Sequence, residues 1–218
     1  MSYLFMKSFF TRIVLMLGAL SVSSALFAAE DNAAQQLVKA LGNFSALAAD
    51  FDQRVVDEKG VELQKSSGYM LAAKPDRMIW QIKKPFQYLV ITDGKTLWRY
   101  DADLEQATRQ PYDGDLRQTP ALVFSADVEK LQERYDIRLQ NSDSSGSRFE
   151  LVPRSGEKLF RSFTLAIRDQ QINQLVMTDN IGQTTTVNFS ALQKNPPIKA
   201  DQFQFTPPPE TDIIDHAQ

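Results

Sequence analysis

Apolar residues recur at every second position along much of this chain, which is the pattern of half-buried β-strands. The alternation is clear at Leu47, Ala49 and Phe51, and turn residues separate the segments that follow. Further strands are predicted at Val61–Ala73, Arg77–Lys83, Gln87–Thr92, Thr96–Tyr100, Leu104–Arg109, Ile137–Asn141, Arg148–Pro153, Phe160–Arg168, Ile172–Thr178 and Gln183–Leu192. Many short strands without long helices between them indicate antiparallel order in a sandwich, a barrel or a strongly curved sheet.

Helical spacing replaces the alternation in two places. Asp31–Leu41 puts its apolar residues on one side and is followed by Gly42, so we expect a helix there. Thr119–Phe124 offers a capping threonine, a proline at the first helical position and an apolar body. Val128–Arg134 is a candidate for another short helix. Segments of this kind are able to cover a sheet.

The end of the chain alternates once more and then stops. Phe203-Gln204-Phe205 has the spacing of a strand, and Pro207-Pro208-Pro209 ends it. We expect Glu210–Gln218 to be an extended tail.

Residues 1–28 have the features of a Sec signal peptide. Lys7 and Arg12 supply positive charge, Ile13–Leu20 is mostly apolar, and small residues follow up to Ala28. We expect cleavage after Ala28 or one residue away, leaving residues 29–218 as a single domain in the periplasm. Translation starts at Met1 or at Met6; the sequence does not decide between them.

Charge and the absence of cysteine narrow the possible partners. Of the 24 Lys and Arg residues, only Lys7 and Arg12 lie in the signal, so the remainder carries 22 basic and 27 acidic residues. The signs are interspersed, which argues against binding to nucleic acid. Without cysteine the chain has no disulfide, no thiolate metal ligand and no site for N-terminal lipidation. We expect a freely diffusing monomer.

The residue types that usually carry catalysis are scarce. His216, the only histidine, is two residues from the end, so no Ser-His or metal-His arrangement is predicted. Three pairs of carboxylates remain, and most such pairs are solvated faces and turns: Asp50 and Asp52, Asp101 and Asp103, Asp113 and Asp115. We therefore expect no catalytic residue, no cofactor and no metal. A carboxylate-based hydrolase is kept as an alternative.

Aromatic residues are abundant, with 14 Phe, 6 Tyr and 2 Trp. In most proteins of this size such residues fill the core. The alternative is a curved sheet whose concave face binds an apolar ligand. Periodicity alone does not distinguish a filled interior from an open one.

One hairpin links the pattern to a known family. Asp93-Gly94 is a tight turn, Leu97-Trp98-Arg99-Tyr100 favours a strand, and Leu104, Gln106 and Thr108 continue at period two. This run resembles the mid-chain motif of the periplasmic outer-membrane lipoprotein carrier (LolA) family. Shorter matches stand in the family's order at Leu47–Gln53, Gly68, Lys74-Pro75, Trp80, Pro85 and Phe203–Pro208.

The resemblance implies both a fold and a function. The fold is mainly β with short helices: an incomplete, half-open antiparallel β-barrel whose apolar concave face is covered by a helical lid. The function is that of a periplasmic chaperone, which takes acylated lipoproteins from an inner-membrane ABC-type lipoprotein-releasing complex to an outer-membrane lipoprotein receptor. Another apolar-ligand or lipoprotein-sensing module of the same fold is the nearest alternative.

The resemblance also implies roles for particular residues. Lys74 stands where the family has an arginine that bonds to the lid and favours closure, and Arg77 is close enough to share this latch role. The residues expected in the hydrophobic cavity and its lid are Leu47, Phe51, Met78, Trp80, Trp98, Leu122, Val123 and Phe124. Core packing is an equal explanation for Trp80 and Trp98.

Overall fold

The computed structural model describes residues 33–42, 44–112, 124, 131–133, 135–144, 146–154, 160–199 and 201–216. Within these residues, twelve strands form one sheet: β1 (Ala46–Val56), β2 (Glu62–Ala73), β3 (Arg77–Lys84), β4 (Tyr88–Thr92), β5 (Thr96–Asp101), β6 (Gln106–Pro111), β7 (Tyr135–Asp143), β8 (Gly146–Pro153), β9 (Phe160–Arg168), β10 (Gln171–Asp179), β11 (Thr184–Lys194) and β12 (Asp212–Asp215).

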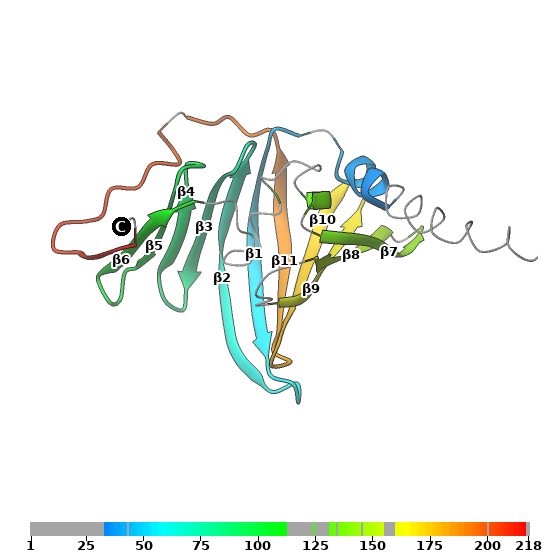
Figure 1. The fold of residues 1–218 in the computed structure, drawn as a ribbon, viewed down its shortest axis with the longest axis horizontal. Helices are drawn as coiled ribbons and strands as arrows, with labels where there is room; N and C mark the ends of the chain where they lie inside the picture. The colour runs from blue at the N-terminus through cyan, green and yellow to red at the C-terminus, as the bar shows by residue number, and fades with distance from the viewer. Residues whose placement is uncertain are drawn as a thin grey trace, which may run out of the picture.

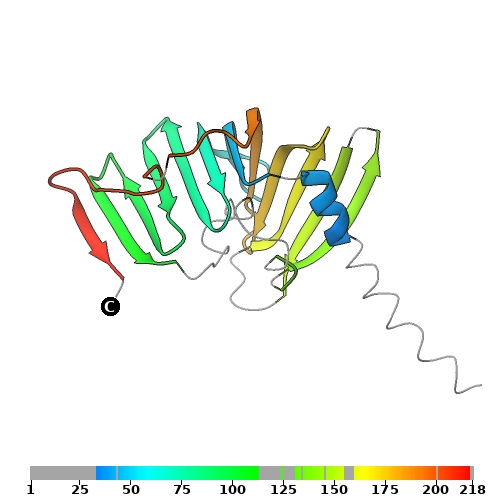
Figure 2. The same ribbon diagram turned by 90° about the horizontal axis from the view of Figure 1, so that it is seen from above.

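The sheet is open, with the order β12-β6-β5-β4-β3-β2-β1-β11-β10-β9-β8-β7. Hairpin neighbours pair antiparallel, and β1 with β11 joins the two halves of the sheet. The outermost strands do not meet, and Figure 2 shows the sheet bent into a trough. The prediction of a mainly β fold and of an incomplete, half-open barrel is therefore confirmed.

The antiparallel prediction is wrong for one strand. β12 lies parallel to β6, from Asp212 opposite Gln106 to Asp215 opposite Arg109. The sequence predicts only an extended tail here, because four residues at the end of the chain give too short a pattern. The segment crosses from the end of β11 to the far edge of the sheet, as Figure 1 shows, so a parallel approach is geometrically available.

Alternation gives the sheet two different faces. One face, which we call the inner face, carries the large core cluster, including Leu47, Phe51, Trp80 and Leu165. The opposite, outer face carries a smaller cluster of Ala46, Ala48, Leu71, Ala73 and Phe203. Residues of β1 are thus divided between the two clusters in the alternating manner that the sequence predicts.

The predicted first helix is present over residues 33–41 and lies on the inner side of the trough (Figure 2). Its Ala33, Ala34 and Leu37 are buried in the inner cluster. Gly42 ends it with φ of 69°, a conformation that suits glycine. The Nζ atom of Lys194 donates to the Leu41 carbonyl at 2.9 Å, so a cation from β11 satisfies the helix C-terminus.

The last residues of the chain cover part of the outer face. Phe203 is buried there, and the Phe205 ring contacts those of Trp98 and Tyr100 with centroids 5.5 and 5.4 Å apart. Phe203 lies in a turn and Phe205 in a segment without regular secondary structure, so the predicted strand at this place is not formed. The alternating apolar residues Phe203 and Phe205 pack their side chains onto the outer face of the sheet and do not add a strand to it.

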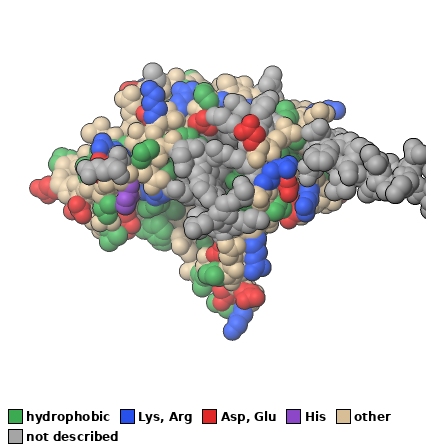
Figure 3. Space-filling model, in the orientation of Figure 1, with side chains coloured by type: hydrophobic (Ala, Val, Ile, Leu, Met, Phe, Trp, Pro, Cys, Tyr) green, Lys and Arg blue, Asp and Glu red, His purple; other side chains and the backbone are tan. Residues whose placement is uncertain are grey.

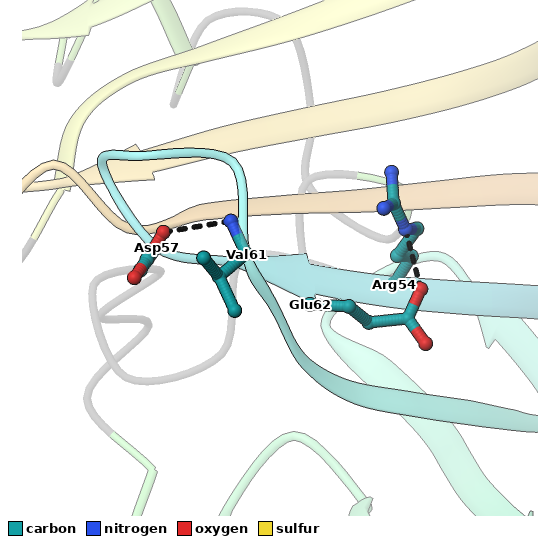
Figure 4. A network of polar contacts seen from close by, with 4 residues as sticks. All are labelled: Arg54, Asp57, Val61 and Glu62. Atoms are coloured by element: carbon teal, nitrogen blue, oxygen red, sulfur yellow. Dashed lines mark hydrogen bonds and ion pairs between the residues drawn. The ribbon is translucent and has the colours of Figure 1, made fainter.

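Two hairpin tips project together below the sheet in Figure 1. In the β1–β2 tip, Asp57 Oδ1 accepts hydrogen bonds from the backbone N–H groups of Lys59 and Val61, and Arg54 pairs with Glu62 at 2.6 Å (Figure 4). The neighbouring β10–β11 turn brings Gly182 against the Glu58 side chain. Figure 3 shows charged side chains of both signs at this projection.

Leu104 belongs to a turn and not to β6, contrary to the prediction, because Asp101 Oδ1 accepts hydrogen bonds from the N–H groups of Asp103 and Leu104. The predicted signal peptide, residues 1–28, lies outside the described residues, as does the predicted helix start at Thr119. No helix in the part of the chain that the structure describes is long and apolar enough to cross a membrane.

Candidate functional site: an aromatic row on the inner face

Four aromatic rings follow one another across the inner face. Phe51 of β1 stacks on Trp80 of β3, with ring centroids 4.0 Å apart and an interplanar angle of 18°. Trp80 meets Phe189 of β11 edge-on at 6.4 Å, and Phe189 meets Phe124 edge-on at 5.4 Å. We call Phe51, Trp80, Phe189 and Phe124 the aromatic row. Stacked and edge-to-face pairs at these distances are favourable arrangements of aromatic rings.

Gly68 makes the stack between β1 and β3 possible. It lies on β2, between those two strands, opposite Phe51 on one side and Ile82 on the other. A Cβ atom at this position would come within 2.7 Å of Phe51 Cζ and 1.9 Å of the Gln81 carbonyl oxygen. The absence of a side chain therefore lets the Phe51 ring reach across β2 to Trp80, which explains why a glycine stands within a strand.

The structure brings most of the predicted cavity residues together. Leu47, Phe51, Met78, Trp80 and Phe124 all belong to the inner cluster and are at most 8% exposed. Leu122 and Val123 lie outside the described residues. Burial of this kind suits core packing as well as the wall of a binding site.

Trp98 is separated from this group. Its neighbour Leu97 is in the inner cluster, so Trp98 points to the outer face, where it meets Phe205 and the Arg109 guanidinium. Both Leu97 and Trp98 are apolar, and the sequence pattern therefore gives no means of deciding which of them faces inward. The outer face here is packed against the C-terminal segment.

Several inner-face residues are not evident from the sequence. Phe189 joins the aromatic row, and the half-buried Tyr88, Met177 and Phe160 pack against the same cluster. The signal that points to Phe189 is its period-two relation to the buried Val187. This signal is weak because polar residues surround Phe189 at Asn188 and Ser190.

Charged groups adjoin the apolar cluster on the inner face. In the alternation of β5, Arg99 and Asp101 share a face with Leu97, which belongs to the inner cluster. Burial raises the pKa of the Tyr88 phenol; Arg99 opposes this and Asp101 adds to it. Tyr88 is therefore neutral at physiological pH. The buried Ser66 hydroxyl has no hydrogen-bond partner among the described residues, whereas Thr92 accepts a bond from Gly94 N–H at 3.1 Å.

The two predicted latch residues lie at the turn between β2 and β3. The Lys74 ammonium is 5.1 Å from the centre of the Phe44 ring, and Phe44 belongs to the inner cluster. Arg77 donates to the Lys74 carbonyl oxygen at 3.0 Å, while its guanidinium lies over Phe203 on the outer face. Lys74 is thus next to the inner cluster, and Arg77 is directed away from it.

The candidate catalytic carboxylates that the structure describes do not form a site. Asp50 and Asp52 are on β1, where Asp50 is exposed, and Asp101 holds a turn through its hydrogen bonds to backbone N–H groups. Asp113 and Asp115 are outside the described residues. Among the described residues, no group of three or more His, Cys, Asp or Glu side chains is arranged to hold a metal ion.

Fold and site together define a class of protein: an open, curved and mainly antiparallel sheet with an aromatic inner face. The family model described as outer membrane lipoprotein carrier protein LolA matches residues 42–206. The chain belongs to this family.

Curated relatives agree with the family assignment. An outer-membrane lipoprotein carrier protein of Azotobacter vinelandii is 34% identical over 201 residues, covering 92% of this chain and 97% of the relative. The protein of the same name from Pseudomonas aeruginosa PAO1 is 35% identical over 201 residues, covering 92% of this chain and 96% of that one.

Solved structures show the same fold at low sequence identity. A LolA superfamily protein from Nitrosomonas europaea has a TM-score of 0.50 at 13% identity, covering 79% of this chain and 97% of its own. An uncharacterized conserved protein from Thermus thermophilus has a TM-score of 0.51 at 13% identity, covering 89% of this chain and 99% of its own. These similarities concern the fold alone.

Proposed function

We propose that this protein is a periplasmic lipoprotein carrier, which binds the acyl chains of lipoproteins on its inner face and delivers them to the outer membrane. The observation that carries the proposal is the aromatic row on the open side of a curved sheet, in a chain that belongs to the lipoprotein carrier family. The protein acts by binding and release, and needs no catalytic residue or cofactor.

The chemistry of the cargo explains why such a surface is needed. Each methylene removed from water contributes about 0.8 kcal/mol, so an acyl chain of about sixteen carbons loses on the order of 12 kcal/mol when it is exposed. A carrier must shield the chain and must also release it. Apolar contact is non-directional, so it shields a chain without fixing it in one geometry.

The half-buried members of the inner face are the natural contact points for an acyl chain. Phe189, Tyr88 and Met177 pack against the buried cluster but remain partly accessible. Phe51, Trp80, Leu47 and Met78 support them from beneath. Flexible Met and flat aromatic side chains adapt to chains of different length and branching.

A lid completes the proposed site. Phe124 is 3% exposed and touches Phe189, so it covers one end of the aromatic row; Leu122 and Val123 are proposed to share this role. We assign the latch to Lys74, because it adjoins Phe44 of the inner cluster. Arg77 contributes by holding the turn through the Lys74 carbonyl.

The partners follow from the same proposal. The protein accepts acylated lipoproteins from an inner-membrane ABC-type complex and passes them to a lipoprotein receptor at the outer membrane, acting as a monomer in the periplasm. Each transfer requires a surface that is apolar enough to take the acyl chains and shallow enough to give them up.

A binding measurement tests the site directly. Phe189→Asp places a charge in the middle of the aromatic row and should weaken the binding of a lipid-modified peptide at least tenfold, because the carboxylate must be desolvated beside the acyl chain. Binding would be followed by displacement of an environment-sensitive hydrophobic dye, with the melting temperature recorded for each protein.

Ile181→Asp is the matched control, since Ile181 is 77% exposed at the β10–β11 hairpin tip, away from the row. It introduces the same charge and should leave the affinity within a factor of two. Equal affinity of the wild type and the Phe189 variant, with both proteins folded, would move the acyl site away from the aromatic row.

A further inference from the structure

The inner face holds a buried hydroxyl that the fold does not use. Ser66 of β2 is 3% exposed, and its Oγ atom has no hydrogen-bond partner among the residues that the structure describes. Thr92, the other buried polar side chain in the described part of the chain, accepts a hydrogen bond from Gly94 N–H at 3.1 Å. Buried hydroxyl groups normally have a partner, because burial removes their hydration. The Ser66 hydroxyl therefore has a donor to offer to a ligand.

The register of the central strands places Ser66 beside the aromatic row. Ser66 is opposite Gln53 of β1, and Gln53 is opposite Val187 of β11, which belongs to the inner cluster. Directly opposed residues of antiparallel strands project to the same face, so Ser66 and Gln53 both lie on the inner face. Two residues further along β1, and about 7 Å away, are Phe51 and its opposite residue Phe189, both members of the aromatic row.

Ser66 also stands where the buried part of β2 ends. The inward-facing residues on one side of it, Gly68 and Met70, are buried. On the other side the next inward-facing residue is Gln64, which is half-buried and lies opposite the half-buried Val55. A chain that lies over the aromatic row therefore passes Ser66 on its way to the more exposed end of the inner face.

The chemistry of a paired acyl anchor matches this position. Two acyl chains joined to one glycerol carry two neighbouring ester carbonyls, whose oxygens accept hydrogen bonds and donate none. In an apolar site without a donor these oxygens lose their hydration without replacement. The part of the cargo beyond the esters must continue into solvent. The esters are therefore best placed at the boundary between the buried and the half-buried parts of the face, beside a hydrogen-bond donor.

We propose that Ser66 donates a hydrogen bond to an ester carbonyl of a diacylglyceryl group, with the acyl chain over the aromatic row and the cargo leaving past Gln64. The inference rests on the proposed carrier function and adds to it a polar anchor and a direction for the bound chain. The Gln53 side chain, opposite Ser66, brings two further N–H donors for the neighbouring carbonyl. Because Ser66 is shielded from solvent in the free protein, the inner face has to open before this contact forms.

Two lipopeptides with the same peptide and the same chain length test the inference. One carries a diacylglyceryl group with two ester carbonyls, and the other a dialkylglyceryl group with ether links and no carbonyl. Dye displacement measures the affinity of each protein for both. The wild type should bind the ester form about fivefold more tightly. Ser66→Ala should reduce this preference to below about twofold by weakening the binding of the ester form alone.

The melting temperature separates an anchor from a structural hydroxyl. It should not fall in Ser66→Ala, because the removed group has no partner in the free protein. Ser67→Ala is the matched control: it makes the same change on the same strand, but its side chain projects to the outer face, so affinity and preference should stay as in the wild type.

Equal affinity of the wild type for the two lipopeptides would overturn the inference, as would a preference that Ser66→Ala leaves intact or that both serine variants lose alike. A lower melting temperature of Ser66→Ala would also count against it, since the hydroxyl would then be bonded within the free protein. Failure of the wild type to bind either lipopeptide is a different result, which contradicts the proposed carrier function itself and this inference with it.

Discussion

Gly68 illustrates how a single residue decides the geometry of the inner face. The Phe51 ring lies over it and stacks on Trp80, and the space for a Cβ atom is already taken by Phe51 and by the Gln81 carbonyl. A strand position that normally favours a β-branched residue is therefore occupied by the one residue without a side chain.

Gly68→Ala should destabilise the protein by about 3 kcal/mol, because either the stack or the β2–β3 pairing has to move. Gly60→Ala is the control. Gly60 has φ of 80°, and a Cβ atom there would meet no atom of the described residues within 4 Å, so its replacement costs only the backbone strain, about 1 kcal/mol. Urea unfolding of both variants measures the difference; equal losses would show that Gly68 is not needed for packing.

Residues also show the limits of prediction from sequence. Leu47, Phe51 and Trp80 are predicted to lie together because alternation and the family motif agree on them, and Met78 is predicted to join them where the family often has an aromatic residue. The inner cluster contains all four. Trp98 is predicted to join them but faces the other way. Its true partner, Phe205, is more than one hundred residues away, so no local pattern reports the contact.

At the scale of elements, the strands and the first helix were predictable, but the course of the C-terminal segment over the outer face was not. Hairpins β1 to β6 follow from alternation and turn residues, which act over short distances. β12 is short, and its place beside β6 depends on the path of the preceding segment across the outer face. The positions of the edge strand and of the segment that crosses the outer face depend on long-range contacts, about which local sequence propensity carries little information.

The proposed latch is a property of the β2–β3 turn. If Lys74 holds the lid closed, Lys74→Leu should widen the mouth of the trough and impair cargo hand-over more than thermal stability, whereas Lys74→Arg should favour closure. Because the chain has no cysteine, spin labels on cysteines introduced at Leu122 and Asp93 would report the distance. Identical distance distributions for wild type, Lys74→Leu and Lys74→Arg would exclude Lys74 as the latch.

At the scale of the whole molecule, the sheet separates two kinds of surface. The inner face carries the large apolar cluster and the aromatic row, while the outer face carries the C-terminal segment at one end. Curvature gives the inner face its function, since a flat sheet with the same side chains would offer no shelter to an acyl chain. On that face Tyr88, Met177 and Phe189 are half-buried, whereas Phe51, Trp80 and Phe124 are buried.

The central claim is that this protein carries lipoproteins stoichiometrically. Spheroplasts that hold newly made lipoprotein would be incubated with increasing amounts of the mature protein, and the released lipoprotein measured in the supernatant. We predict release in proportion to added protein, saturating near one cargo per molecule, with Asp50→Asn and Asp101→Asn unchanged. Release of many cargo molecules by each protein molecule, or its loss in a folded Asp→Asn variant, would contradict the carrier account and favour a carboxylate hydrolase.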